Sequence, residues 1–220
     1  MKSIALWLIV LVTMAVSLCK AQVTPVVAKE RIVHDVLDSQ GNVVSHSETF
    51  GKYLRNSAGS TITQIYSSVG GKTAIRSGQL EDYSRQKLYA LNYERQEAVE
   101  QGNLTHGPHP EYLANAKTAL GEETVNGLPC LIHSVFMDAD GKQRLIGKKY
   151  DSAEYGLTVK EDAIFQLPGT PPTRRIVELY DIQIVEPDPK EFALEKFSFL
   201  EKGPAACSKP ETSASLESLK

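Results

Sequence analysis

The chain has 220 residues, with 24 Lys and Arg against 27 Asp and Glu, which gives a formal net charge of −3. This length suits one domain with terminal extensions, and 41% hydrophobic and 23% charged residues exclude a wholly disordered chain. The near-neutral balance lacks the basic footprint that nucleic-acid-binding proteins carry, so we expect no nucleic-acid partner.

The first 21 residues have the pattern of an export signal. Lys2 precedes an apolar run over residues 4–16, and Lys20 follows that run. The run is shorter than the ~20 residues that cross a bilayer, so we predict a cleaved signal peptide, residues 1–21, and a mature chain that begins at Gln22. A retained anchor helix is the alternative. Export places the mature protein in the periplasm or outside the cell, where we expect membrane contact to be only transient or peripheral.

The three cysteines raise two further questions about an exported chain. Lipid attachment to Cys19 is a second alternative for the N-terminus, but Leu18 stands where a lipid-attachment box has a small residue. Removal of the signal leaves Cys130 and Cys207, and an oxidising compartment allows these two to form a disulfide. Two unpaired thiols, or a disulfide between two chains, stay open as alternatives.

The body of the chain, residues 28–200, is predicted to be a single β domain. Turn signals rich in Gly, Asn, Asp and Pro recur at short intervals and separate segments of strand length. Connections this short favour antiparallel pairing, because a parallel crossover needs a dozen or more residues. The predicted strands are residues 30–38, 43–55, 60–67, 73–77, 87–92, 122–126, 130–137, 142–151, 156–166 and 174–185.

The apolar pattern of these strands predicts how each one is covered. Residues 157–165 and 180–184 alternate between apolar and polar side chains, so each should have one buried and one wet face. Residues 43–55 are polar on both faces until Phe50, which is typical of a sheet edge or an exposed arm. Residues 31–38 and 130–137 carry apolar side chains on both faces, which predicts cover on both sides.

Two short helices and a disordered tail complete the predicted organisation. Residues 93–101 are good helix formers followed by Gly102, and residues 110–120 carry apolar side chains at helical spacing before Gly121. Residues 201–220 have little to bury and are predicted to be disordered.

Three segments of the chain resemble a known family. They are a "G-E-x-T-x-x-G" hairpin within residues 120–130, a "Y-D-x-x-x-x-G-L" strand within 149–159, and an "E-P-D-P-x-x-F" segment at the end of a strand within 182–192. This order is similar to exported bacterial proteins of the LolA/LolB-like lipoprotein-carrier superfamily. The resemblance implies a mainly β fold: a curved antiparallel sheet, or incomplete barrel, with two or more short helices on its concave side. In the characterised carriers that concavity holds lipid acyl chains.

The residue patterns that carry enzyme or metal chemistry are weak in this chain. His106 and His109 flank Gly-Pro and belong to a loop, while a structural zinc site needs four ligands. The chain has no Gly-x-Ser-x-Gly nucleophile elbow. We therefore expect no enzyme activity, no metal and no cofactor.

The leading functional hypothesis is a non-enzymatic exported carrier for a lipid or a lipoprotein acyl chain. A half-open sheet must cover its apolar face with helices, a ligand or a partner protein. Each Å² of apolar surface that stays exposed to water costs about 25 cal/mol of free energy. The residues expected to line the ligand are Tyr89, Leu91, Tyr180, Ile182 and Ile184. The alternative for these residues is core packing against helices at 93–101 and 110–120. The alternative function is an envelope interaction protein that uses its sheet edges and binds no small molecule.

Overall fold

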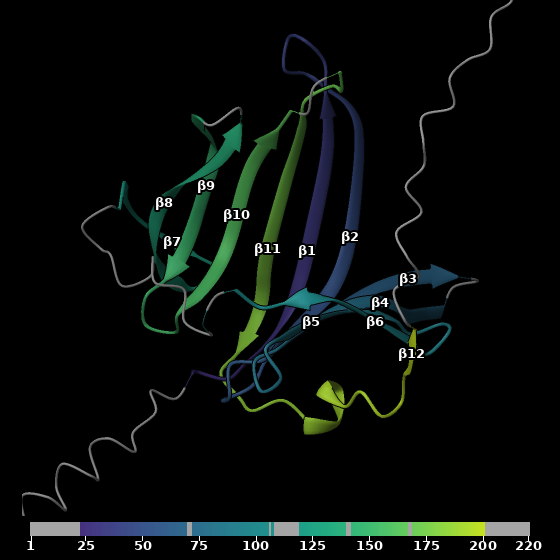
Figure 1. Cartoon of the computed structure of the whole chain (residues 1–220). Coiled ribbons are helices and arrows are strands. Elements are labelled where there is room, and N and C mark those ends of the chain that lie inside the picture. The colour runs from purple at the N-terminus through teal and green to yellow at the C-terminus, as the bar shows by residue number, and fades with distance from the viewer. Residues whose placement is uncertain are drawn as a thin grey trace, which may run out of the picture.

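A computed structural model describes residues 23–69, 72–105, 107, 119–139, 142–166 and 169–200. These residues form one curled sheet of twelve strands (Figure 1). The strands are β1 (Val26–Leu37), β2 (Val43–Arg55), β3 (Thr61–Val69), β4 (Lys72–Asp82), β5 (Lys87–Asn92), β6 (Glu97–Asn103), β7 (Gly121–Val125), β8 (Leu128–Ala139), β9 (Lys142–Ser152), β10 (Leu157–Phe165), β11 (Thr173–Gln183) and β12 (Ser198–Leu200). A 3₁₀ turn, η3 (Pro189–Phe192), precedes β12.

The sheet is an open antiparallel meander whose two halves meet at β1. Its strand order is β12-β6-β5-β4-β3-β2-β1-β11-β10-β9-β8-β7, so β1 pairs with β2 on one side and β11 on the other. All neighbours run antiparallel except β12, which lies parallel to β6. The predicted mainly β fold with one curved antiparallel sheet that does not close is confirmed, whereas the two or more short helices predicted for its concave side are not found among the described residues.

Two glycines let the sheet bend sharply between β2 and β4. A Cβ on Gly51 would lie 2.5 Å from the backbone oxygen of Gln64, and one on Gly78 would lie 2.6 Å from that of Thr63. Only glycine permits such close backbone approach. In Figure 1, β3 and β4 accordingly run at a steep angle to β2, and β3 pairs with β2 only from Gly51 onward.

The first hydrophobic core lies on one face of β2–β6. Direct cross-strand partners share a face, and Leu54 stands opposite Ile62, which stands opposite Leu80. The chain after β11 covers this face with two buried residues, Leu194 and Phe197. The core residues are Leu54, Ile62, Leu80, Tyr89, Leu91, Ala98, Leu194 and Phe197.

The second core lies on the opposite face of the sheet, at β1 and β11. Ala28 of β1 and Leu179 of β11 belong to this core, and the β7–β8 hairpin contributes Val125 and Cys130 to it. The amide nitrogen of Asn126, at the hairpin tip, donates to the backbone oxygen of Leu179 over 2.7 Å. The core residues are Val26, Ala28, Val125, Cys130, Leu157, Val159 and Leu179. Burying each large aliphatic side chain contributes about 1.5–3 kcal/mol.

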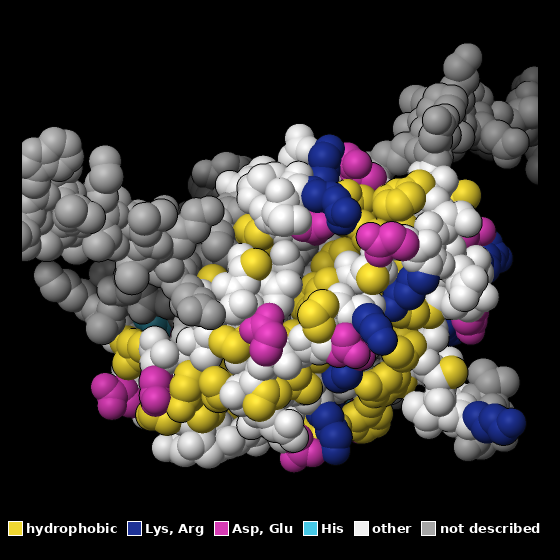
Figure 2. Space-filling model, turned by 90° about the horizontal axis from the view of Figure 1, so that it is seen from below, with side chains coloured by type: hydrophobic (Ala, Val, Ile, Leu, Met, Phe, Trp, Pro, Cys, Tyr) yellow, Lys and Arg dark blue, Asp and Glu magenta, His cyan; other side chains and the backbone are white. Residues whose placement is uncertain are grey.

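Both cores lie at the end of the sheet where β1 begins and β11 ends. Figure 2 shows this end from below, with a band of hydrophobic side chains bordered by charged ones. β1 is buried on both of its faces, by Val26 and Ile32 on one and by Val33 and Leu37 on the other, so the predicted double cover of this strand is confirmed.

A buried arginine fastens β2 to the turn between β9 and β10. Arg55 is 4% exposed and donates to three backbone oxygens. Its Nε reaches Thr24 at 2.9 Å, its Nη2 reaches Tyr155 at 2.6 Å, and its Nη1 bonds to Gly156. Burial lowers the pKa of the guanidinium from its ordinary value. The arginine thus satisfies three carbonyl groups that connect distant parts of the sheet.

The prediction of a helix over residues 93–101 is wrong. Residues 93–96 form a turn, in which Gln96 has φ +53°, and Glu97 begins β6. Helix propensity is a weak preference that tertiary pairing overrides, and here Ala98 is fully buried opposite Leu91. The helix predicted over 110–120 lies mostly outside the described residues, and Gly121 begins β7. No helix in the described part of the chain is long and apolar enough to span a membrane.

Candidate functional site

The end of the sheet away from both cores carries exposed apolar side chains. The structure leaves 64% of Leu145, 61% of Leu120, 54% of Phe136 and 45% of Ile164 exposed. These four residues, here called the apolar patch, come from β8, β9, β10 and the residue before β7. Large apolar side chains gathered on a surface mark binding sites more often than those scattered singly.

Strand register places three members of the patch on the same face. Phe136 stands directly opposite Leu145, and Ser134, two residues before Phe136, stands opposite Lys148. Lys148 in turn stands opposite Asp162, two residues before Ile164. Side chains two apart on a strand share a face, so Phe136, Leu145 and Ile164 do so as well.

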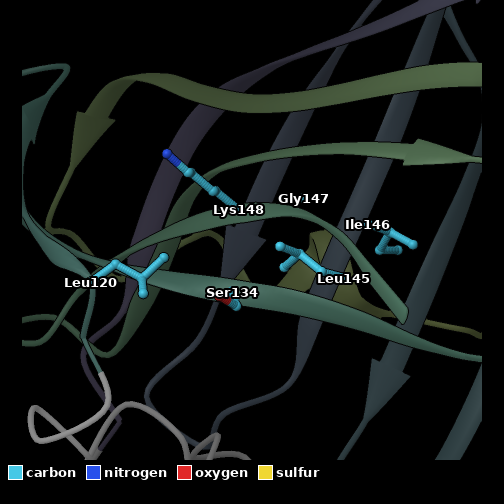
Figure 3. Close-up of a pocket in the computed structure, with 6 residues that line it drawn as sticks. All are labelled: Leu120, Ser134, Leu145, Ile146, Gly147 and Lys148. Carbon is cyan, nitrogen blue, oxygen red and sulfur yellow. The ribbon is translucent and has the colours of Figure 1, made fainter. Parts of the chain in front are cut away.

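A bulge in β9 and a glycine create a depression within the patch. The register shifts between Val135 and Phe136, so that β9 has one extra residue there, and such a bulge bends its strand. A Cβ on Gly147 would lie 2.1 Å from the backbone oxygen of Asp162, so β9 and β10 approach closely there. The depression has a volume of about 290 Å³ and is lined by Leu120, Ser134, Leu145, Ile146, Gly147 and Lys148 (Figure 3).

One cation at the depression, Lys148, has no acidic partner among the residues that the structure describes. Lys148 lines the depression together with Leu120 and Leu145, and Figure 3 shows its side chain extending from β9 with the nitrogen pointing away from both leucines. Asp162, the carboxylate opposite it, is held by Arg174 through two hydrogen bonds, of 2.8 Å from Nε and 2.5 Å from Nη2. Within the described ranges, no ion pair includes Lys148. The ammonium is therefore available to the acidic group of a ligand.

Replacing Asp162 with asparagine is expected to lower the free energy of unfolding by about 1 kcal/mol at neutral pH, the upper end for a partly exposed pair. Hydrogen bonds from Arg174 hold the pKa of Asp162 below its ordinary value. This contribution is present above the pKa of the unfolded chain and is lost as pH falls through the folded pKa. Urea unfolding across acid pH would check this: equal loss at every pH would contradict an electrostatic origin.

The structure places two of the five predicted ligand residues in the first core. Tyr89 is 5% and Leu91 3% exposed, and both pack with Leu194 and Phe197. The Tyr89 ring also meets Phe199 edge to face, with centroids 5.9 Å apart. Their cover comes from the segment after β11.

The other three predicted residues do not form one row. Asp181 has φ +49°, and the register between β1 and β11 shifts at this point, which breaks the alternation. Tyr180 lies beside Lys29, whose Nζ is 5.8 Å from the ring centre, whereas Ile182 packs against the second core. Ile184 lies beyond the end of β11 and is 42% exposed. A ligand-lining role for these residues stays a prediction.

A buried polar cluster lies between β8, β9 and β10. Asp151 accepts a 2.6 Å hydrogen bond from the Thr158 hydroxyl, and its other oxygen lies 3.6 Å from Lys149 Nζ and 4.0 Å from His133 Nε2. The side chains of Asp151 and His133 are 1% and 6% exposed. The hydrogen bond from Thr158 to Asp151 joins β10 to β9.

The cysteine and histidine predictions fall mainly outside the described residues. Cys130 is buried, and burial raises the pKa of its thiol. Cys207, Cys19, residues 1–21, residues 201–220 and both His106 and His109 lie outside the described ranges, so the disulfide, the signal peptide and the tail stay predictions.

The apolar patch was missed by sequence reasoning. Apolar residues on both faces of 130–137 predicted that this strand is covered twice, and for Phe136 that prediction is wrong. A usable signal was present in Leu145 and Ile146, which lie among Arg144, Lys148 and Lys149. Lys and Arg bury their aliphatic stems along apolar neighbours while the charged ends stay in water, so this mixture is compatible with an exposed apolar surface.

Comparison with known proteins finds distant structural likeness. No protein-family model and no curated protein matches the chain. It is similar to the LolA superfamily protein NE2245 from Nitrosomonas europaea, with 11% identity over 79% of this chain and 91% of that one, at a TM-score of 0.36.

Two further solved structures were returned at lower TM-scores. One is a DUF1329 family protein from Desulfovibrio piger ATCC 29098, with 9% identity over 82% of this chain and 93% of that one, at a TM-score of 0.22. The other is a candidate outer membrane lipoprotein-sorting protein domain from Vibrio parahaemolyticus. Its sequence identity is 8% over 76% of this chain and 88% of that one, at a TM-score of 0.23.

Proposed function

We propose that the chain is an exported binding or carrier protein for an amphipathic, acyl-type ligand in the cell envelope. The observation that carries this proposal is the depression on β8 and β9. It is lined by exposed aliphatic side chains and by Lys148, which forms no ion pair with any residue in the described ranges. Ligand pockets combine apolar walls with a few polar groups that fix orientation. The export signal predicted for residues 1–21 supports the compartment.

The chemistry of the depression favours an acyl chain that ends in an acidic group. Leu120 and Leu145 are both more than half exposed, and covering such a side chain contributes up to about 1.5–3 kcal/mol. Lys148 supplies a positive charge at the same place. A volume of about 290 Å³ fits a short part of an acyl chain, at the lower limit of small-molecule sites.

The proposal predicts that Leu145→Glu lowers affinity for a fluorescent fatty acid by roughly tenfold or more, since a charge would face the acyl chain. Leu145 is 64% exposed, so the thermal midpoint should stay unchanged. The probe is titrated by fluorescence into the wild type and the variant. Absence of saturable binding by the wild type would refute a carrier role.

Ile184→Glu is the matched control for that titration. Ile184 is also exposed and belongs to the residue set predicted from sequence to line the ligand. We expect it to bind the probe like the wild type. Loss of binding in Ile184→Glu with retention in Leu145→Glu would move the site to the end of β11.

A second variant tests the charge. Lys148→Met should weaken binding of a labelled fatty acid several-fold, yet leave the corresponding fatty alcohol unaffected, because only the acid has a carboxylate to pair with the ammonium. An equal loss for both ligands would mean that Lys148 acts through its aliphatic stem alone.

A further inference from the structure

The turn between β7 and β8 contains the only Asn-Gly pair in the sequence. Asn126 and Gly127 have φ values of +50° and +83°, which is the pattern of a type I′ turn. Both residues are exposed, and a Cβ on Gly127 would meet no atom of the described residues within 4 Å. The turn is therefore open to water, and the residue after Asn126 has no side chain to shield its backbone nitrogen.

The side chain of Asn126 fastens this turn to β11. Its Nδ2 donates to the backbone oxygen of Leu179 over 2.7 Å and to Glu178 Oε1 over 3.1 Å. The other oxygen of Glu178 lies 4.0 Å from Arg31 Nη1. Both contacts of the asparagine use its NH₂ group as the donor, so they depend on the amide being intact.

The β7–β8 hairpin closes part of the second core. β7 is the last strand of the sheet and pairs only with β8 (Figure 1). Val125 and Cys130 from this hairpin are 7% and 2% exposed. The contact between Asn126 and β11 thus helps to hold a cover over the Cys130 thiol, which water and reagents reach only when the hairpin moves.

We propose that Asn126 is a site of spontaneous deamidation, and that this modification loosens the β7–β8 hairpin from β11. The backbone nitrogen of Gly127 forms a bond to Cγ of Asn126, the Cγ–Nδ2 bond breaks, and ammonia leaves with the proton of the Gly127 nitrogen. Water then opens the succinimide ring. Opening at the side-chain carbonyl gives aspartate, and opening at the main-chain carbonyl gives isoaspartate. Asparagine is among the thermolabile residues, and the step needs only water.

The product reverses the contacts that Asn126 makes. A carboxylate has no proton to donate, so the backbone oxygen of Leu179 loses its donor. The new negative charge also faces the carboxylate of Glu178, and like charges at such a separation repel. Arg31 offsets this repulsion only in part, because it also bonds to Glu48. Isoaspartate adds a further effect, since its extra main-chain carbon lengthens the turn.

The two hydrogen bonds also affect how fast the modification occurs. Cyclisation requires Cγ of Asn126 to approach the Gly127 nitrogen, and the contacts with Leu179 and Glu178 restrain that rotation. We therefore expect the folded protein to deamidate more slowly than the chain in urea, at a rate set by opening of the turn.

Ageing of the full chain at mildly alkaline pH tests the modification itself. Peptide mass mapping, together with enzymatic detection of isoaspartate, should show conversion at Asn126 that rises steadily with time. Asn42 is the matched control: it is exposed in a turn and its Nδ2 also donates to a carboxylate, that of Asp38, over 3.0 Å. The branched side chain of Val43 follows it and hinders cyclisation, so Asn42 should convert several-fold more slowly. Conversion at Asn126 in urea but none in the folded protein would overturn the proposal.

Alkylation of Cys130 tests the consequence. The protein is reduced first, and the rate at which Cys130 is labelled is then measured by peptide mass. Asn126→Asp should raise this rate by roughly tenfold or more, since it removes two hydrogen bonds and adds repulsion. Asn126→Gly suits a type I′ turn and removes the same hydrogen bonds without a charge, so we expect a smaller rise.

Asn42→Asp is the control for the labelling measurement. It places the same new charge beside a carboxylate, that of Asp38, but in the turn after β1, whereas the second core contains the beginning of that strand. Its Cys130 should be labelled at the rate of the wild type. Unchanged labelling in Asn126→Asp, or an equal rise in Asn42→Asp, would overturn the proposed loosening. Equal rises in Asn126→Asp and Asn126→Gly would overturn the role given to the new charge.

Discussion

Replacing Arg55 with alanine is expected to lower the free energy of unfolding by about 3–5 kcal/mol, among the largest single effects in this chain. The guanidinium donates to the backbone oxygens of Thr24, Tyr155 and Gly156, and it is almost completely buried. Its removal leaves three carbonyl groups without a donor, and each buried group left unsatisfied costs about 1–3 kcal/mol. Urea unfolding monitored by circular dichroism would measure the loss.

Arg76→Ala is the control for that measurement. The Arg76 side chain is 65% exposed and its Nε lies 3.8 Å from Glu94, so its loss should change stability by less than about 1 kcal/mol. Equal losses for the two variants would contradict the role given to Arg55. Because Arg55 ties β2 to the β9–β10 turn, its loss should also speed proteolysis between Ser152 and Leu157.

Gly51→Ala is expected to destabilise the protein by about 3 kcal/mol or to prevent folding, since overpacking against backbone leaves little room to relax. The added methyl group would lie 2.5 Å from the backbone oxygen of Gln64, a separation that requires β2 and β3 to move apart. The expected result is a lower urea midpoint together with new exposure of the first core to a hydrophobic dye.

Gly121→Ala is the matched control for the glycine prediction. Gly121 also lies in a strand, β7, but nothing stands within 4 Å of the added Cβ. At such a site alanine reduces the entropy of the unfolded chain and should leave stability unchanged or raise it by up to about 1 kcal/mol. If both substitutions were tolerated, close approach at Gly51 would not be what allows the sheet to bend.

Strand positions were read well from the sequence because their boundaries depend on local turn chemistry. Residues 43–55 and 87–92 were predicted with the bounds that β2 and β5 have in the structure. The turn at Asn126-Gly127 was also read correctly, and both residues there have positive φ. Two strands were missed. β6 has a helix-forming sequence, and β12 has only three residues.

The candidate site was not predictable in the same way, because exposure depends on which part of the sheet another segment covers. Leu91 and Leu145 are both leucines on strands, yet one is 3% and the other 64% exposed. The difference is that Leu194 and Phe197, from the segment after β11, cover Leu91. The sequence pattern of the strands does not indicate where that segment packs. The alternation at 180–184 failed for a similar reason, since the bulge at Asp181 changes which face each side chain meets.

By itself the sequence determined the fold class, most of the strands and the antiparallel connections, since turn residues and period-two patterns act over a few neighbours. It also determined that β2 has an exposed polar stretch. Only the tertiary structure decided where the sheet bends, which face each core occupies, and which apolar side chains stay in contact with water. These depend on the approach of backbones distant in sequence, at Gly51 and Gly147, and on the path of the chain after β11.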